Sequence, residues 1–360
     1  MTPSFWPGKR VFITGDTGFK GSWLSLWLSD LGAHVTGFAL EPPTQPSLFD
    51  VARIGESIRH VSGDIRDADA VARSIRESSP DFIIHMAAQS FVRLSYQFPV
   101  DTFSTNVLGT VNILEAARGA GKKTAVLVVT SDKCYENRER EDGYREDDAM
   151  GGHDPYSASK GAAEIATSAY RRSFFHPNSK VAVATARSGN VIGGGDWSKD
   201  RLVTDIMSAL LAGTRPLIRN PDAVRPWQHV LDPLAGYLGL CERLWSDGPD
   251  FAEAWNFGPE RADMVPVRAV ADRLCALWSN NAGWDLDSGA HPHEAGKLYL
   301  DCTKARQRLD WSPRWRLDQG LRAVAAWYRN FHKGDDPRTL MRAQIASFMA
   351  PGHDEPTEPR

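Results

Sequence analysis

The sequence contains few cysteines, and they follow no recognisable pattern. Its 360 residues include four, Cys134, Cys241, Cys275 and Cys302, with neither a CxxC pair nor the Cys/His spacing of a zinc site. This scatter argues against a disulfide framework and against a structural metal. We therefore expect no metal ligands and a reducing, cytoplasmic setting.

Long apolar runs and a dominant charge are also absent. The 42 basic and 45 acidic residues give a formal net charge of -3, which offers no broad field for nucleic acid or an anionic membrane. No apolar run reaches the ~18 residues of a membrane span, and Met1 to Gly8 lacks the pattern of a signal peptide. The sequence thus predicts a cytoplasmic protein without nucleic-acid or membrane partners.

What the first half does contain is an alternation of short β-branched runs and longer amphipathic stretches. This rhythm is typical of strands joined by crossover helices, and it predicts an α/β fold with a doubly wound parallel sheet of the Rossmann type. The predicted strands are residues 10–13, 34–38, 82–85, 125–130 and 181–186, and the predicted helices are residues 22–31, 68–78, 107–118 and 157–174.

After Arg187 the alternation weakens, and proline- and tryptophan-bearing loops become frequent. A helix is predicted over 204–212 and a last one over 317–331. We expect a dinucleotide-binding domain over 1–187, to which parts of roughly 215–255 return. A smaller, interleaved substrate domain is expected over 188–349, followed by a polar, proline-rich flexible tail over 350–360.

A glycine-rich turn follows the first predicted strand and opens a helix. Gly15, Gly18 and Gly21 have the spacing GxxGxxG, which lets backbone N–H groups at a helix N-terminus reach a pyrophosphate. A turn without a ligand is the alternative, but the position at the first strand-to-helix junction favours a dinucleotide. The candidate contacts in this turn are Gly15, Thr17, Gly18, Phe19, Lys20 and Gly21. Spacing alone leaves open whether Lys20 reaches a phosphate or is solvated.

The identity of the dinucleotide depends on the residues after the second predicted strand. An acid usually ends that strand and binds the adenosine ribose, but here Phe38, Ala39 and Leu40 precede Glu41. No basic residue lies between Phe38 and Pro46, which weighs against the extra phosphate of NADP. We therefore expect NAD.

Tyr156 and Lys160 lie four residues apart at the start of a predicted helix, so they share a face. A tyrosine in water titrates near pH ~10, and a neighbouring cation makes it a usable base near neutrality. The same spacing also occurs in purely structural helices. Because the two residues follow a glycine-rich turn that favours dinucleotide binding, we interpret them as a catalytic pair.

A second polar cluster, Ser131, Asp132 and Lys133, follows the predicted strand at 125–130. Ligands in open parallel sheets bind at the carboxyl ends of the strands, so these side chains are well placed for chemistry. A turn or helix cap made by Ser131 and Asp132 is the alternative.

From Val11 to about Tyr328, the chain resembles the nucleotide-sugar branch of the extended short-chain dehydrogenases, the NAD-dependent epimerase/dehydratase family. Within that branch it is similar to the CDP-glucose 4,6-dehydratases. The segments that carry this similarity are Gly15–Leu24, Ala87–Arg93, Thr130–Tyr135 and Arg225–Val230, of which the last two discriminate most.

The resemblance implies a reaction in three stages on CDP-glucose with bound NAD. Tyr156, as phenolate, would take the proton of the sugar C4 hydroxyl while a hydride leaves C4. Ser131 would hydrogen-bond that oxygen, and Lys160 would keep the tyrosine anionic. Water would then leave across C5 and C6 with Asp132 as acid and Lys133 as base, before the hydride returns to C6.

Lys133 departs from the pattern of the dTDP- and GDP-sugar dehydratases, which have a glutamate at this position. A lysine must be neutral to accept a proton. Two roles therefore stay open for Lys133, the C5 base or an electrostatic stabiliser of the enolate.

The resemblance also implies further binding residues. Asp64 would accept from the adenine amino group, although a helix cap is its alternative. The further candidate cofactor contacts are Asp64, Ile65, Ala87, Ala88 and Gln89, together with Tyr156 and Lys160. The candidate substrate contacts are Ser90, Asn190, Trp197, Arg201, Arg225 and Asn256. Trp197 and Trp227 fall in expected substrate loops, whereas Trp23, Trp27 and Trp327 are predicted to be core.

Two other functions and an assembly are to be weighed. A 4-epimerase or reductase on the same fold would need Ser131, Tyr156 and Lys160 but no adjacent acid and base, and a non-catalytic dinucleotide-binding protein would need none of them. Helices at 101–118 and 157–174 resemble those of a four-helix dimer contact in the family, so a homodimer or a higher assembly is expected by analogy.

Overall fold

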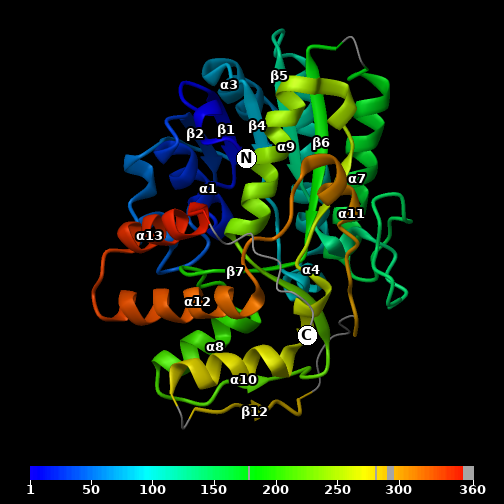
Figure 1. The fold of residues 1–360 in the computed structure, drawn as a ribbon. Helices are drawn as coiled ribbons and strands as arrows, with labels where there is room; N and C mark the ends of the chain where they lie inside the picture. Colours follow the sequence, from blue (N-terminus) through cyan, green and yellow to red (C-terminus); the bar gives the residue numbers. More distant parts are fainter. Residues whose placement is uncertain (177–178, 280–281, 290–295, 352–360) are drawn as a thin grey trace.

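The computed structural model describes residues 1–176, 179–279, 282–289 and 296–351 (Figure 1). Its main body is a seven-stranded parallel sheet in the order β10-β6-β5-β4-β1-β2-β3. The strands are β1 (Arg10–Thr14), β2 (His34–Ala39), β3 (Arg59–Ser62), β4 (Phe82–His85), β5 (Thr124–Val129), β6 (Val181–Ser188) and β10 (Ala254–Phe257). The order reverses between β1 and β4, which confirms the doubly wound sheet.

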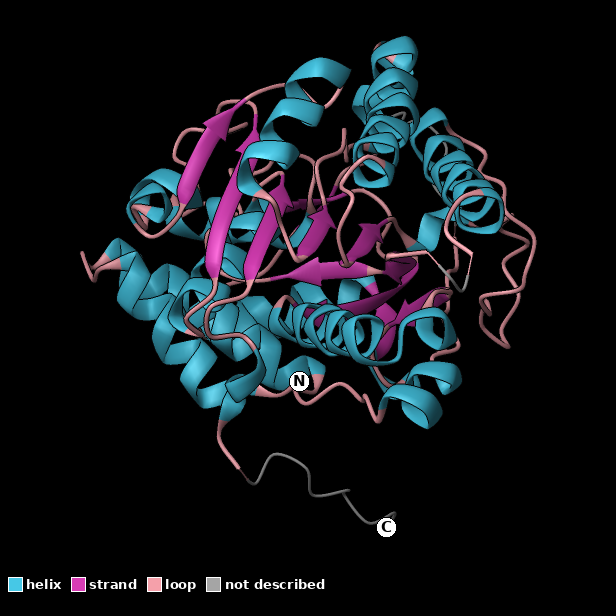
Figure 2. Cartoon of the chain, turned by 90° about the horizontal axis from the view of Figure 1, so that it is seen from above, coloured by secondary structure: helices cyan, strands magenta, loops and turns pink. Residues whose placement is uncertain are grey.

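Helices cover both faces of this sheet (Figure 2). They include α1 (Phe19–Asp30), α3 (Ala68–Ser78), α6 (Gly109–Arg118), α7 (Pro155–Ser173) and α9 (Leu231–Asp247). Shorter elements of this half are η1 (Pro3–Phe5), α2 (Leu48–Val51), η2 (Ile54–Glu56), α4 (Val92–Gln97), α5 (Pro99–Phe103), the π-helix η3 (Ser104–Leu108) and η4 (Asp132–Cys134). The predicted helix at 107–118 is thus the second part of a longer helical segment, in which α5, η3 and α6 follow one another without a break.

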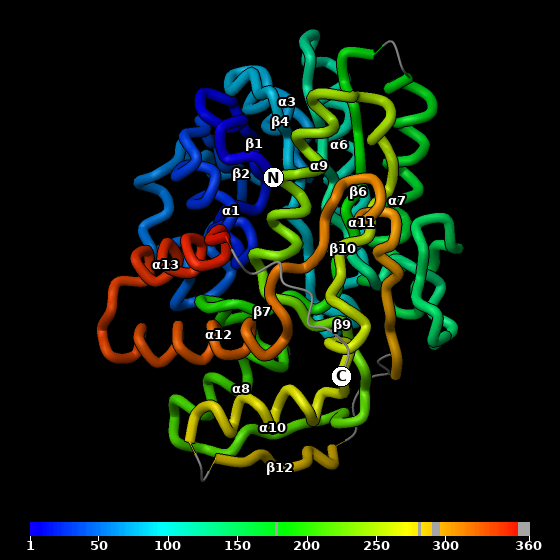
Figure 3. Tube along the Cα trace, in the orientation of Figure 1, coloured from blue at the N-terminus to red at the C-terminus, as the bar shows by residue number. Residues whose placement is uncertain are grey.

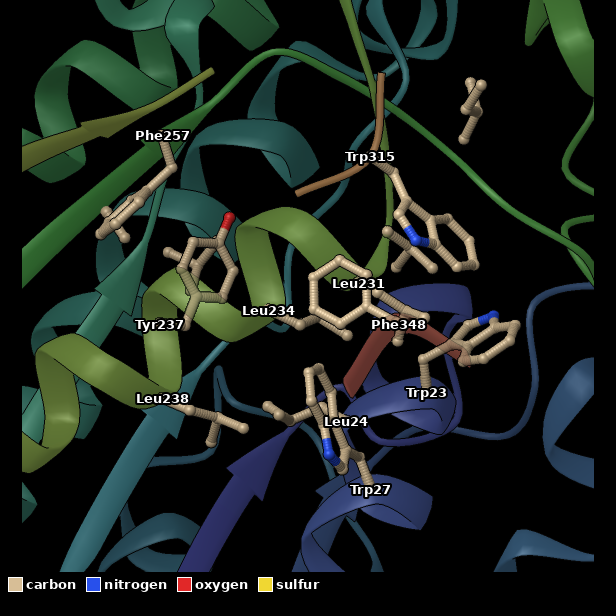
Figure 4. Packing of buried hydrophobic residues seen from close by; sticks show 14 of the residues in the cluster. Trp23, Leu24, Trp27, Leu231, Leu234, Tyr237, Leu238, Phe257, Trp315 and Phe348 are labelled. Carbon is tan, nitrogen blue, oxygen red and sulfur yellow. The ribbon is translucent and has the colours of Figure 1, made fainter. Parts of the chain in front are cut away.

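The sheet buries a separate apolar cluster on each face because successive side chains of a strand point to opposite sides. On one face Phe12 and Ile83 pack with Val71 of α3 and Ile113 of α6. On the other face the cluster joins α1 and α9 to the C-terminal helices (Figure 4). Its large members include Trp23, Trp27, Tyr237, Trp315, Trp327 and Phe348. The prediction that Trp23, Trp27 and Trp327 are core is confirmed.

Most of the remaining elements form a second layer beside the carboxyl ends of the parallel strands (Figures 1 and 3). A three-stranded sheet has the order β11-β9-β7, and β12 pairs with β8. Their bounds are β7 (Asn190–Ile192), β8 (Leu217–Ile218), β9 (Val224–His229), β11 (Met264–Pro266) and β12 (Asp285–Leu286). The helices of this layer are α8 (Leu202–Leu211), η6 (Arg261–Asp263), α10 (Val267–Trp278) and α12 (Leu317–His332). Three further helices pack against the main body: η5 (Gly248–Phe251) on α9 and β6, α11 (Thr303–Leu309) on β10 and α9, and α13 (Pro337–Met349) on α1 and α2.

The interpretation of 317–331 as the last helix is wrong, because α13 follows it. Asp336 caps α13 by accepting from the backbone N–H of Thr339, and Pro337 occupies its first turn. Met341, Ile345 and Phe348 lie on one face and are buried. Figure 1 shows α13 beside α1, so the C-terminal helix closes the core around Trp27.

The segment that returns to the first body runs over α9 and β10. α9 packs against β5 and β6, and β10 extends the parallel sheet beyond β6. The division into a cofactor domain and a substrate domain stays a prediction, as does the tail, since residues 352–360 lie outside the described residues. Within the described chain, no helix is long and apolar enough to cross a membrane.

Asp232 near the start of α9 fixes the segment that leads into α12. Its Oδ1 accepts from the backbone N–H groups of Arg314 at 2.6 Å and Trp315 at 3.3 Å. The carboxyl is fully buried. Burial raises the pKa of Asp232 to about 7, although the two backbone hydrogen bonds oppose that rise.

The sign of the pH dependence follows from that raised pKa. An unfolded aspartate loses its proton near pH ~4, so between about pH 4 and pH 7 only the folded chain holds this proton. The Asp232 contribution to stability is therefore lost as pH rises through this window. We expect Asp232→Asn, which keeps a carbonyl acceptor, to raise the Tm at pH 8 and to change it little near pH 4.5. Thermal unfolding at both pH values tests this, and an equal shift at both would contradict it.

Candidate active site

A cavity of about 1040 Å³ opens at the carboxyl ends of the parallel strands. It begins at the β1 turn, where the strand order reverses, and extends under the second layer to β8 and β9. Crevices at such a reversal are where open α/β sheets bind ligands. The volume is large for a single small molecule and suits two ligands placed end to end.

The glycine turn forms the floor of one end of the cavity. Gly15 has φ +79°, and a Cβ there would lie 2.9 Å from the backbone of Ala87. A Cβ on Gly21 would lie 2.0 Å from the carbonyl oxygen of Gly15. Only glycine fits at these two positions, and no acidic residue occupies the first turn of α1. The turn is therefore a cradle for a negatively charged group.

The far side of this cradle is lined by Ala39, Leu40, Glu41, Asp64 and Ile65. Asp64 does not cap α3, whose cap is Asp67. Its carboxylate instead accepts from Arg66 at 2.6 and 2.9 Å, and this pairing lowers the pKa of Asp64. The prediction about basic residues at this end of the cavity rests only on the segment after β2. Arg66 was missed because it follows β3.

α7 begins where the sequence predicted a catalytic helix. Asp154 caps it by accepting from the N–H of Ser157, which places Tyr156 in the first turn. Both Tyr156 and Lys160 line the cavity. Burial raises the pKa of Tyr156 to about 12, although the neighbouring Ser131 hydroxyl opposes that rise. Burial lowers the pKa of Lys160 to about 8.

Ser131, Asp132 and Lys133 leave the end of β5 and turn into η4 (Asp132–Cys134). Ser131 Oγ accepts from the N–H of Lys133 at 3.2 Å and donates to Asp132 Oδ1 at 2.9 Å, so it both caps the turn and holds the acid. Asp132 is 2% exposed, and its Oδ2 has no hydrogen-bond partner among the described residues. Burial raises the pKa of Asp132. All three side chains face the cavity.

Lys20 points into the cavity rather than into solvent. Its Nζ donates to Ser188 Oγ at 3.0 Å, and Ser188 is itself hydrogen-bonded to the Tyr237 hydroxyl at 2.8 Å. Burial, together with the charges of Arg201 and Lys160, lowers the pKa of Lys20 to about 7. Lys20 is therefore, with Lys160, a second lysine of the cavity whose pKa lies near neutrality.

A buried ion pair behind the site escaped sequence reasoning. Glu164 lies one turn after Lys160 on α7, and its Oε2 accepts from Arg187 Nη2 and Thr185 Oγ1, both at 2.8 Å. Burial raises the pKa of Glu164, but Arg187 and the Thr130 and Thr185 hydroxyls outweigh it. The four-residue spacing of Tyr156, Lys160 and Glu164 was the available signal.

Among the predicted substrate contacts, Ser90, Asn190, Arg201 and Arg225 line the cavity. Arg225 lies on β9 and not in the loop that the sequence suggested. Its guanidinium donates to the carbonyls of Val224 and Gly296. Arg201 donates to Asp196 at 2.8 Å and Ser90 at 3.0 Å. Both guanidinium groups are thus held in place in the cavity wall.

Trp197, Asn256 and Gln89 do not line the cavity. Trp197 packs edge-on against Trp327 and Phe331 of α12. The Asn256 side chain accepts from Tyr135 and donates to two backbone carbonyls, while Gln89 holds its own loop. That these three residues contact a ligand stays a prediction, and the geometry does not support it. Conversely, Asp205, Arg215, Leu217, Arg219 and Asn220 line the cavity and were not predicted.

The parallel sheet, the glycine turn and the Tyr/Lys helix beside a Ser/Asp/Lys turn define a dinucleotide-dependent enzyme of the short-chain dehydrogenase class. A family model described as GDP-mannose 4,6 dehydratase matches residues 12–247. The CDP-glucose 4,6-dehydratase of Salmonella typhimurium is 50% identical over 351 residues, which is 96% of this chain and 98% of that protein. The chain therefore belongs to the nucleotide-sugar 4,6-dehydratase family, and the predicted family is confirmed.

More distant proteins share the fold. The dTDP-glucose 4,6-dehydratase of Haemophilus influenzae is 26% identical, with 89% of this chain and 97% of that protein covered. The Bacillus anthracis dTDP-glucose 4,6-dehydratase, solved with NAD, superimposes with a TM-score of 0.76 at 22% identity over 92% of this chain and 100% of that one. The Thermotoga maritima UDP-glucose 4-epimerase gives 0.77 at 21% identity over 89% and 99%.

We expect Glu164→Gln to destabilise the folded chain by about 3–5 kcal/mol, because it leaves the buried Arg187 charge without its counter-ion. The control is Glu77→Gln, which breaks the exposed Arg59–Glu77 pair and should cost at most about 1 kcal/mol. Urea unfolding of both variants measures the difference. Equal destabilisation by the two substitutions would show that the buried Glu164–Arg187 pair does not hold α7 against the sheet.

Proposed function

We propose that this chain is an NAD-dependent CDP-glucose 4,6-dehydratase that converts CDP-glucose to CDP-4-keto-6-deoxyglucose and water. The single observation that carries this is the presence of Asp132 and Lys133 in the same cavity as Ser131, Tyr156 and Lys160. A 4-epimerase or reductase has no need of an acid and a base beside the redox set. The 50% identity to a CDP-glucose 4,6-dehydratase supports the choice of nucleotide.

The residues around the glycine turn suit NAD. The cradle at Gly15 and Gly21 and the acid-free start of α1 would hold its pyrophosphate. Glu41 lines the adenosine end, and Arg66 is already paired with Asp64 and Asp101, which favours NAD over a 2′-phosphorylated cofactor. When bound, NAD supplies a hydride acceptor for C4 and, once reduced, a hydride donor for C6.

Tyr156 is the base that starts the reaction. As phenolate it accepts the proton of the C4 hydroxyl, and Ser131 orients that oxygen. The raised pKa of the phenol means that the anion needs cations nearby, and Arg201 already lowers it. Lys160 and the positive nicotinamide would add to this effect, so the base forms only when the site is loaded.

Asp132 and Lys133 serve the loss of water. Once C4 is a ketone, the C5 proton is acidic and Lys133 accepts it or stabilises the enolate. Asp132 donates its proton to the departing C6 hydroxyl. Its raised pKa and buried, unpartnered Oδ2 suit a carboxylic acid that keeps its proton until the leaving group arrives.

The diphosphate of the sugar nucleotide would lie between Arg201 and Arg225, whose planar forks match its oxygens. Asn190 at the start of β7 lies in the same wall. Arg219 and Asn220 line the end of the cavity away from the catalytic turn and would contact the nucleoside. Asp205 lies beside them, and burial raises its pKa to about 6.

A homodimer is part of this proposal. Val100 is 79% exposed, Leu108 58% and Ile165 61%, and they lie on the adjoining elements α5, η3 and α7. Phe98 and Phe103 add to the same apolar surface. An exposed apolar area on packed helices favours a second copy with the same helices.

The function is tested by incubating the purified protein separately with CDP-, dTDP-, UDP- and GDP-hexoses. We expect a 4-keto product from CDP-glucose, no net accumulation of NADH, and much lower rates with the other nucleotides. A 4-epimer as the only product would favour the epimerase, and no change of any sugar would favour a non-catalytic protein.

The role of Lys133 is separable from the redox step. We expect Lys133→Met to leave formation of reduced cofactor nearly intact and to slow the exchange of C5 hydrogen with deuterated solvent by roughly 10²-fold or more. Mass spectrometry of recovered sugar nucleotide in D₂O measures the exchange. Unchanged exchange would reject both the base and the enolate-stabilising role.

Charge on the apolar helix surface should separate the dimer. We expect the double variant Val100→Asp and Ile165→Asp to sediment as a monomer, because each change buries a negative charge without a partner in the proposed contact. Leu286→Asp, at a residue that is 59% exposed on β12, is the control and should sediment as the unmodified protein does. A double variant with unchanged sedimentation would place the contact elsewhere.

A further inference from the structure

The orientation of the sugar nucleotide follows from the proposed function, on which this inference rests. With the sugar beside Tyr156 and the diphosphate between Arg201 and Arg225, the nucleoside lies at the end of the cavity away from the catalytic turn. We call this part of the cavity the nucleoside end. Its lining includes residues of α8 and of the segment around β8, namely Asp205, Ala209, Arg215, Leu217, Arg219 and Asn220.

The pyrimidine bases differ in the group that they carry at C4. Uracil and thymine have a carbonyl oxygen there, which accepts hydrogen bonds, whereas cytosine has an amino group, which donates them. A side chain that can only accept therefore favours cytosine, and a side chain that can only donate favours uracil and thymine. The hydrogen-bonding groups left open at the nucleoside end thus indicate which base it takes.

The two guanidinium groups at this end are already bound to protein acceptors. Arg219 Nη1 donates to Asp200 Oδ1 at 2.9 Å. Arg215 Nε donates to Asp285 Oδ1 at 2.9 Å, and its Nη2 donates to the carbonyl of Trp284 at 2.8 Å. A carbonyl oxygen at C4 of the base would have to compete with these acceptors for a donor.

Asp205 is the anionic acceptor at this end. It lies one turn after Arg201, the N-cap of α8, so the two residues share a helix face, and both line the cavity. The backbone of Asp200 supplies one hydrogen bond to the Asp205 carboxyl group, and no side chain of the described residues donates to it. Burial raises the pKa of Asp205 to about 6, although the charge of Arg219 opposes that rise. Above neutral pH the group is therefore mainly a carboxylate with unused lone pairs.

We propose that Asp205 selects cytosine by accepting a hydrogen bond from its 4-amino group. The turn of α8 from Arg201 to Asp205 rises about 6 Å, which carries the carboxylate past the diphosphate toward the base. In uracil or thymine the same position holds an oxygen, and two facing acceptors repel each other. Asp205 therefore determines the nucleotide specificity and takes no part in the steps at C4, C5 and C6.

An isosteric substitution tests this role. Asp205→Asn keeps the shape of the side chain and adds an amide N–H that can donate to the carbonyl oxygen of uracil. We expect the ratio of kcat/KM for CDP-glucose to kcat/KM for UDP-glucose to fall roughly 10- to 10²-fold. The control is Asp222→Asn, which removes an exposed carboxylate between β8 and β9 and should leave this ratio as in the unmodified protein.

Binding gives a second measurement that does not depend on turnover. Isothermal titration calorimetry of the full chain with CDP and with UDP should show weaker binding of CDP and tighter binding of UDP in the Asp205→Asn variant. An equal change for both nucleotides would overturn the proposal, because it would place Asp205 at the ribose, which the two nucleotides share. An unchanged preference for CDP in the variant would also overturn it.

Failure of the proposed function gives a different result. The unmodified protein would then form no 4-keto product from CDP-glucose, while its preference for CDP over UDP in calorimetry would still depend on Asp205.

Discussion

The buried pair between Glu164 of α7 and Arg187 of β6 is the interaction on which the site depends. Thr130 and Thr185 donate to the same carboxylate, so a single side chain of α7 is fixed to the ends of both β5 and β6. Because Lys160 lies one turn and Tyr156 two turns before Glu164 on the same face, this ion pair also sets their distance from Ser131. Burying a charged pair costs free energy. Here the pair specifies a single arrangement of α7 against the sheet.

The cavity contains several ionisable groups whose pKa values are moved by burial toward neutral pH. The pKa of Lys20 falls to about 7 and that of Lys160 to about 8, while the pKa of Asp132 rises. A reaction that moves protons and a hydride within one closed space needs groups that change charge without a large cost.

Sequence reasoning was successful where a local pattern specifies the chemistry. The alternation of strands and helices, the glycine turn and the Tyr156/Lys160 spacing each express a backbone or helix constraint that is visible in one segment. It was weaker where distant segments meet. Arg66 reaches the cavity from the end of β3, and the Asn256 side chain is hydrogen-bonded to Tyr135 and Tyr144. Trp197 packs on α12. The missed helix α13 depended on its contact with α1, which no window of the sequence contains.

In the proposed reaction, one molecule of sugar nucleotide gives up a hydride at C4 and receives the same hydride at C6. The most direct measurement is to convert CDP-glucose carrying deuterium at C4, mixed with unlabelled substrate, and to locate the label by NMR and mass spectrometry. We expect deuterium at C6 of the product, with no transfer between molecules. Deuterium kept at C4, or shared with the unlabelled molecules, would contradict it.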